Sequence, residues 1–157
     1  AEARTSAESF SVPSSRRERL MKPERVVKKF YEGLEEGVIY ARKCKECGAI
    51  EFPPRYACNT CGYHETEWTT ITGMGYLESF VLPGPMTVRE ELAAMGDGDY
   101  CFGEVRLDEG PSINAVIFGV PAKKADELYG RLPLRVKPRI TQRPEGYKIL
   151  YFELAED

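Results

Sequence analysis

The sequence CKECG at residues 44–48 returns as CNTCG at residues 58–62. In each copy two residues separate two cysteines, so a tight turn can direct both thiols toward one point. Four thiolates held in this way suit the tetrahedral site of a structural zinc ion, and iron binds the same set. Gly48 and Gly62 follow the turns, where a chain that folds back under a metal needs a residue tolerant of positive φ. The pattern therefore predicts a closed metal site with no position left for water or substrate. Its ligands would be Cys44, Cys47, Cys58 and Cys61.

Other roles for these residue types stay open in the sequence. The four cysteines could form two disulfides or a redox C-x-x-C, although a redox motif usually occurs singly before a helix. His64, the single histidine, could replace a thiolate as ligand or lie outside the site. Cys101, the fifth cysteine, lies in an expected strand, where a small thiol usually fills the core. As a nucleophile it would need a base and an oxyanion site, and neither is apparent in the sequence.

Length and charge limit the class of protein. The chain has 157 residues, which suits one medium domain or a small module attached to one. Its formal net charge of -3 opposes a nucleic-acid binder, which normally carries a basic surplus. No apolar run approaches the roughly 20 residues needed to cross a bilayer, so no membrane partner is expected. Five cysteines, four of them in a metal pattern, indicate a reducing cytoplasm.

Four segments are expected along the chain. Residues 1–22 are rich in Ser, Ala, Glu and Arg and predict a disordered arm. Residues 23–37 predict a helix, because Pro23 suits the first helical position and apolar residues recur at helical spacing. The apolar stripe of this helix either packs on the chain itself or docks on another subunit. Residues 38–68 should form the zinc ribbon, and residues 69–157 a β barrel.

The barrel segment alternates apolar and polar residues between turn signals. Five strands are expected at residues 76–82, 100–107, 113–120, 134–142 and 147–154, with a short helix at 121–129. This order is that of the five-stranded OB barrel. The predicted fold is thus mainly β, with an N-terminal helix, a rubredoxin-like zinc ribbon and an OB-fold barrel.

The connection at residues 83–99 is long for a barrel of this size. Thr87 and Glu90 form a capping-box pattern ahead of a short helix that should end near Met95. Long connections in compact domains are often functional, and this one flanks the usual ligand face of OB barrels. It is the leading sequence candidate for contact with a ligand or partner.

The stretch FPPR at residues 52–55 lies between the two cysteine pairs. Its prolines are expected to hold the linker extended and to fix where Arg55 points. A guanidinium suits a phosphate or a carboxylate, and an ordinary surface charge is the alternative.

No serine elbow, glycine-rich phosphate loop or isolated carboxylate pair stands out in the sequence. This favours a binding or accessory module over a complete enzyme. One alternative is a single-stranded nucleic-acid module, with a stacking platform opposed by interleaved glutamates. The platform would comprise Tyr76, Phe80, Tyr100, Phe102, Tyr147 and Tyr151, and the glutamates are Glu78, Glu104 and Glu153. Another alternative is an electron carrier with iron in the four-thiolate site.

An ordered set of short motifs resembles a known family. They are FYEGL at 30–34, KCKECG at 43–48, FPPR at 52–55, CNTC at 58–61, Trp68, GMG at 73–75 and VRLDEG at 105–110. The set resembles the zinc-ribbon/OB-fold proteins associated with acyl-CoA metabolism, formerly a domain of unknown function. The resemblance runs from about residue 24 to residue 154, and FPPR between two cysteine turns is its most specific part.

The resemblance implies an accessory subunit without its own catalytic residues. Members of the family partner thiolases, thiolase-fold aldolases, hydroxymethylglutaryl-CoA synthases or acyl-CoA hydratases, and some help to hold the CoA ester. The chain length resembles the small subunit of a thiolase-type complex, including the one that cleaves benzoylsuccinyl-CoA. The resemblance further implies zinc at the four cysteines, a CoA phosphate contact at Arg55 and a hetero-oligomer.

Overall fold

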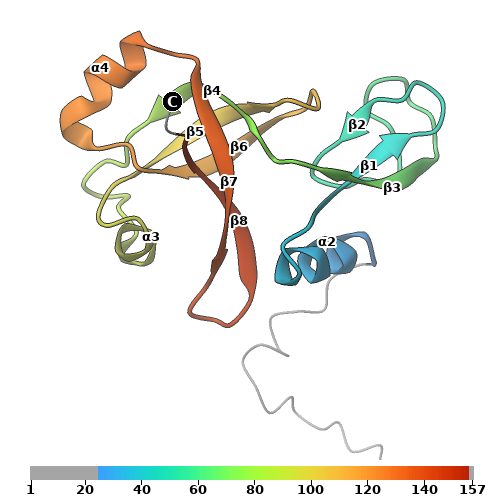
Figure 1. Ribbon diagram of the computed structural model, residues 1–157, viewed down its shortest axis with the longest axis horizontal. Coiled ribbons are helices and arrows are strands. Elements are labelled where there is room, and N and C mark those ends of the chain that lie inside the picture. The colour runs from blue at the N-terminus through green and yellow to red at the C-terminus, as the bar shows by residue number, and fades with distance from the viewer. Residues whose placement is uncertain (1–24, 156–157) are drawn as a thin grey trace, which may run out of the picture.

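The computed structural model describes residues 25–155, so the expected arm at residues 1–22 and the start of the expected helix lie outside the described residues. The chain is mainly β, as predicted, with a helix, a small ribbon sheet and a closed barrel following one another (Figure 1). The elements are α2 (Arg25–Glu35), β1 (Ile39–Cys44), β2 (Ile50–Glu51), β3 (Thr66–Ile71), β4 (Gly75–Val81), α3 (Glu90–Met95), β5 (Tyr100–Leu107), β6 (Ser112–Phe118), a 3-10 turn (Ala122–Lys124), α4 (Ala125–Gly130), β7 (Leu134–Gln142) and β8 (Lys148–Leu154).

The barrel has the predicted OB order. Its strands follow one another as β4-β5-β6-β8-β7, and β7 pairs with β4 to close the ring. All neighbours are antiparallel except β6 and β8. Alternate residues of the strands point inward, so that a fully buried core forms from Leu77, Cys101, Val105, Ile117, Val136 and Phe152. Pro138 lies beyond the last β7 residue paired with β4, where the strand has a free edge, as expected for proline.

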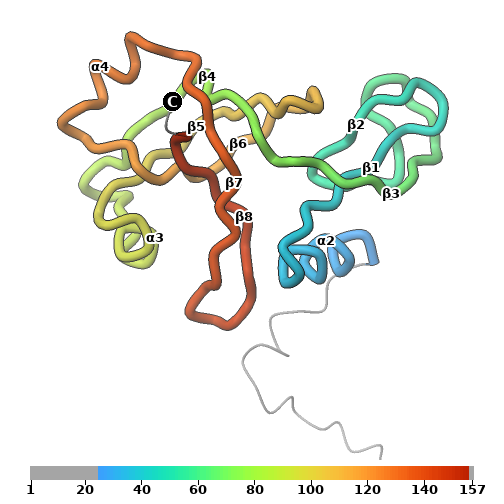
Figure 2. Tube along the Cα trace, viewed as in Figure 1, coloured from blue at the N-terminus to red at the C-terminus, as the bar shows by residue number. Residues whose placement is uncertain are grey.

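The ribbon is a three-stranded sheet in which β1 lies between β2 and β3. β3 continues to Ile71, and the trace then passes through residues 72–74 directly into β4 (Figure 2). Ile39, Ala41 and Ile71 are buried on one face of this sheet and belong to the same core cluster as the barrel interior. Helix, ribbon and barrel therefore share one hydrophobic core.

The apolar stripe of α2 packs against the chain's own ribbon and barrel. Leu34 is fully buried, and Phe30 lies with its ring centroid 5.7 Å from that of Phe52. Tyr31 makes an edge contact of 6.1 Å with Tyr147 at the tip of the β7–β8 hairpin. The periodicity of the stripe predicted the helix, but only these contacts identify the surface that it meets.

A second, smaller core lies between α3 and the outside of the barrel. Leu92 of α3 packs there with Tyr100, Phe118 and Tyr151. The capping box predicted at Thr87 and Glu90 is wrong, because the helix begins at Glu90 without a side-chain cap. The Thr87 hydroxyl instead donates to the carbonyl of Gly84, 3.1 Å away, in a turn that precedes the helix. Within residues 25–155, no helix is both long and apolar enough to span a membrane.

Candidate metal centre

The first cysteine turn joins the end of β1 to β2. The amide of Cys44 donates to the carbonyl of Ala49 at 2.8 Å, and the amide of Gly48 donates to the carbonyl of Cys44 at 3.1 Å. Gly48 has a φ of 75°, a conformation that side chains disfavour. The amide of Glu46 lies 3.4 Å from Cys44 Sγ and donates to it. The turn thereby directs an N–H group at the thiolate that it presents.

The second turn repeats this arrangement. The amide of Cys58 donates to the carbonyl of Tyr63 at 2.9 Å, and the amide of Gly62 donates to the carbonyl of Cys58 at 3.0 Å. Gly62 has a φ of 79°, and the amide of Thr60 donates to Cys58 Sγ at 3.3 Å. The two CxxCG copies therefore fold into the same turn, as their sequences predict.

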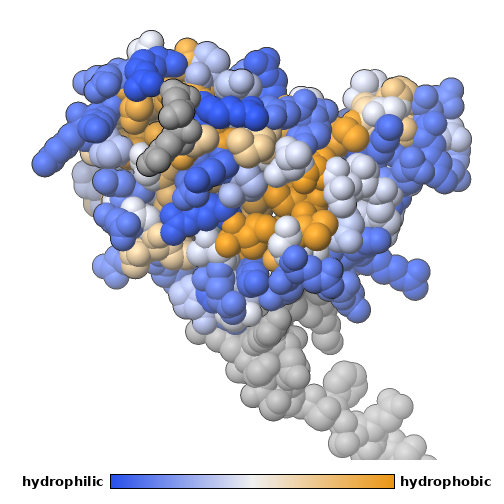
Figure 3. Space-filling view, in the orientation of Figure 1, coloured by the Kyte–Doolittle hydropathy of each residue, from blue (hydrophilic) through white to orange (hydrophobic). Residues whose placement is uncertain are grey.

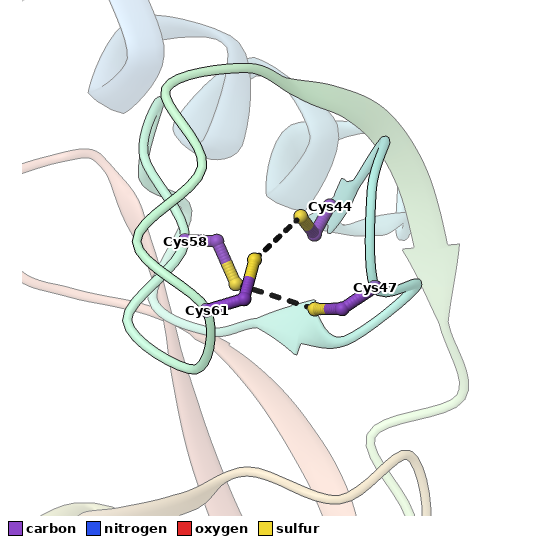
Figure 4. Close-up of side chains that lie close together, drawn as sticks. All are labelled: Cys44, Cys47, Cys58 and Cys61. Atoms are coloured by element: carbon purple, nitrogen blue, oxygen red, sulfur yellow. Dashed lines mark hydrogen bonds between the residues drawn. The ribbon is translucent and has the colours of Figure 1, made fainter.

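The two turns bring four sulfur atoms together. All four Sγ atoms lie within 4.8 Å of one another, with Cys44 facing Cys61 and Cys47 facing Cys58 at 3.6 Å each (Figure 4). A tetrahedral ion with bonds of about 2.3 Å places its sulfur ligands about 3.8 Å apart, so the geometry fits zinc. The cysteines are free thiols here, so the alternative of two disulfides is wrong.

The crowding of the four thiols shifts their pKa values in opposite directions. Burial raises the pKa of Cys44, but hydrogen bonds from the amides of Cys47 and Glu46 outweigh it and bring the value down to about 7. The amide of Ala49 lowers the pKa of Cys47, yet burial and neighbouring thiols raise it to about 12. Four crowded thiolates repel one another, and a bound cation removes that penalty.

The remaining histidine and cysteine lie away from this centre. The side chain of His64 is 76% exposed, and its Nε2 lies 3.7 Å from a carboxylate oxygen of Glu65. It is not among the clustered ligands. Cys101 is fully buried in β5, and burial raises the pKa of its thiol to about 12. The structure therefore places Cys101 as a core residue, as its strand position suggests.

Arg55 is exposed beside the ribbon. Its carbonyl accepts a hydrogen bond of 2.7 Å from Thr66 Oγ1, which fixes the backbone of the loop. Residues 52 and 53 form a bend with a cis bond between them, so the linker is not extended as expected. Arg55 lines a cavity of about 450 Å³ at the junction of ribbon and barrel, together with Glu51 and Glu109. Among the described residues its guanidinium has no ion-pair partner.

Arg42 is a site residue that the sequence reasoning missed. It is only 8% exposed and lies between two rings, 4.6 Å from the centroid of Trp68 and 5.1 Å from that of Tyr56. Its Nε donates to Thr66 Oγ1 at 2.9 Å. Thr66 in turn donates to the carbonyl of Arg55, so Arg42 holds the FPPR loop in place. Nothing in the sequence of this short strand indicates that a charged side chain is buried there.

The stacking platform considered for nucleic acid does not form. Phe80, Tyr100 and Tyr151 are buried in the two cores. Tyr76 is 40% exposed, but the guanidinium of Arg135 lies 4.8 Å from the centroid of its ring. The six aromatic residues thus do not make a common exposed surface.

A scan against protein-family models matches residues 32–67 to ChsH2, rubredoxin-like zinc ribbon domain. Residues 32–67 thus form a zinc ribbon that is similar to the ChsH2 domain. The match and the four-cysteine cluster together support a structural zinc ion in this ribbon. Comparison with curated proteins finds no match.

Two solved structures share the fold of the ribbon and barrel. A chain of "Ltp2-ChsH2(DUF35) aldolase" superposes with a TM-score of 0.65 at 18% identity, covering 87% of this chain and 99% of that one. A DUF35-family protein of unknown function from Sulfolobus solfataricus gives a TM-score of 0.55 at 17% identity, covering 88% and 91%. The chain therefore shares the fold of these two structures over most of its length.

Proposed function

We propose that this chain is a non-catalytic, zinc-bearing accessory subunit of a thiolase-fold acyl-CoA enzyme. The observation that carries the proposal is the ChsH2-type ribbon joined to an OB barrel, since a similar chain is found in an Ltp2-ChsH2 aldolase. The reaction of the complex would be cleavage or condensation of a carbon–carbon bond in a CoA thioester. The thiolase that cleaves benzoylsuccinyl-CoA is one complex of this type whose small subunit the chain resembles.

The zinc centre would serve assembly and shape. All four ligands come from the chain, so a bound zinc ion would supply a cross-link between the two turns and no open coordination position. The turns hold the FPPR loop between them, and Arg42 and Thr66 fix its backbone. A rigid loop can present Arg55 to a partner or ligand at little entropic cost.

The distribution of apolar surface supports a partner. On the face shown in Figure 3, an apolar area with polar side chains around it lies between the barrel and the ribbon. Met86 in the 83–99 connection is 96% exposed, and Val81 before it is 63% exposed. An exposed apolar area with a polar surround, such as the one in Figure 3, often marks an interface.

A reconstitution experiment tests the proposal. The tagged full chain is expected to co-purify with a thiolase-fold enzyme in a fixed ratio, and mixing the two purified chains should raise turnover of the CoA thioester. The chain alone should leave the thioester intact. Cleavage or condensation by the isolated chain, or full activity of the enzyme without it, would remove the accessory role.

Arg55 is proposed to contact a phosphate of the CoA ester. Arg55→Ala should raise the KM of the reconstituted complex about tenfold, which corresponds to one charge-assisted contact of about 1.4 kcal/mol. Arg106→Ala is the matched control, because Arg106 is exposed on the barrel and pairs with Glu78 at 3.0 Å. Equal KM values for the two variants would refute the contact.

A further inference from the structure

The barrel has an incomplete seam. β6 and β8 pair in parallel only at Ile117 with Phe152 and at Phe118 with Glu153. Residues 112–116 of β6 and 148–151 of β8 have no partner across this seam within the described elements. A cavity of about 730 Å³ opens where the two strands diverge.

Rings surround this seam cavity. They come from four separate parts of the fold: Phe30 of α2, Phe52 of the ribbon, Tyr129 of α4, and Phe80, Phe102, Tyr151 and Phe152 of the barrel strands. Val116 of β6 and Ile149 of β8 line the cavity from its two strands, and both are partly buried where they also pack against the second core. Aromatic walls of this kind favour flat or puckered rings in offset and edge contacts.

The charge of the lining limits what can bind. Glu104 is the charged side chain among the lining residues, and no Lys, Arg or His is among them. A phosphate, sulfonate or carboxylate would therefore find no cation and one repelling carboxylate. The exposed amide of Asn114, next to Glu104 in the strand pairing, offers an uncharged hydrogen-bonding group at the rim.

We propose that the seam cavity binds an uncharged, apolar, ring-bearing molecule. Its volume lies within the range of roughly 300–1,000 Å³ typical of small-molecule sites, which are lined mainly by apolar groups with a few polar ones. The proposal goes beyond the accessory role and does not depend on it, because the isolated chain contains the whole cavity.

A pair of fluorescent probes tests the proposal on the purified full chain. N-phenyl-1-naphthylamine is uncharged and ring-bearing, and 8-anilinonaphthalene-1-sulfonate adds an anionic group to the same ring system. The uncharged probe should bind saturably at one molecule per chain, and the sulfonate at least tenfold more weakly. Absence of saturable binding, or equal affinity for both probes, would overturn the assigned ligand class.

Two substitutions locate the binding. Val116→Phe places a larger side chain in the cavity and should lower the affinity for the uncharged probe at least tenfold. Val27→Phe is the control, since Val27 is 39% exposed on α2 and does not line the cavity. Ile149→Phe repeats the test from the opposite strand in case the first variant misfolds, with circular dichroism recorded for each. Unchanged affinity in folded filled variants would overturn the proposal. A different result would also overturn the proposal: a wild-type protein that is dimeric and binds no probe, with a Val116→Phe variant that is monomeric. A second copy of the chain would then occupy the seam.

Discussion

At the residue scale, the burial of Arg42 predicts a stability cost that surface arginines lack. Its guanidinium is bonded to Thr66 and enclosed by Trp68 and Tyr56. Arg42→Met should lower the free energy of unfolding by about 2–3 kcal/mol, because Thr66 loses its donor and the rings lose their cation. Arg42→Lys should recover less than half of the loss, since an ammonium cannot both stack and donate through Nε. Urea denaturation measures both values.

Lys43 provides the matched control for Arg42. It is the next residue of β1 and its side chain is exposed, so Lys43→Ala should change stability by less than about 0.5 kcal/mol. Equal effects at the two positions would mean that Arg42 is not integral to the ribbon. A double-mutant cycle of Arg42→Met with Thr66→Val should give a coupling of about 1 kcal/mol or more.

The ligand set makes a second prediction for single residues. Cys44→Ser should lose most of its bound metal after dialysis, because a structural zinc site depends on all four thiolates. Cys101→Ala, which removes the one thiol outside the cluster, should keep the wild-type metal content. Mass spectrometric metal analysis of both proteins makes the comparison. Equal metal content in both variants would exclude the predicted ligand set.

At the element scale, the turn between β5 and β6 is joined to β7 by an ion pair. Asp108 accepts two hydrogen bonds from Arg135, of 2.6 and 2.7 Å, and these lower the pKa of its carboxyl from 3.8. The stability that this ion pair contributes is therefore fully present above the ordinary pKa of an aspartate. It is lost as pH falls through the lower pKa that Asp108 has in the folded protein. Because Asp108 is 40% exposed, Asp108→Asn should cost only about 1 kcal/mol or less at neutral pH.

The test of this pair is the pH dependence of the difference between wild type and Asp108→Asn. The difference should be constant from neutral pH to about pH 5 and should shrink as pH falls below the ordinary pKa of an aspartate. The same substitution in an Arg135→Met background should show a much smaller pH dependence. A difference that persists unchanged at the acid end would indicate that another group is responsible.

The elements also show how far the sequence could predict this structure. Period-two alternation located all five barrel strands to within about two residues, and the CxxCG repeats located the metal turns. The alternation of apolar and polar residues does not show which other part of the chain packs against each face of a strand. The rings of Tyr100 and Tyr151 suggested a platform, yet α3 covers them, because Leu92 needs a surface of its own to bury. Arg42 was missed for the converse reason: its burial depends on two rings and a threonine that lie far apart in the sequence.

At the scale of the whole molecule, the shared core couples the ribbon to the barrel. Leu34, Ile71 and Leu77 belong to one buried cluster, although they come from helix, ribbon and barrel. Removal of the metal should loosen the ribbon, and the barrel should then lose the contacts that the ribbon residues make in this core. The barrel should remain folded at 25 °C, but its melting temperature should fall by several degrees. A loss of about 1 kcal/mol shifts the melting temperature of a domain of this size by roughly 2–8 °C.

The chain contains separate reporters for its two parts. Trp68 is the single tryptophan and lies in β3, where the Nζ of Lys29 and the guanidinium of Arg42 approach its ring at 5.1 and 4.6 Å. Chelation should shift its emission to longer wavelength at 25 °C, while hydrogen exchange keeps the amides of β5 protected. Zinc added back should restore both the emission and the melting temperature. A barrel that melts at the same temperature with and without metal would contradict the coupling, since burial of Ile71 and Leu77 in a common cluster requires each part to lose contacts when the other opens.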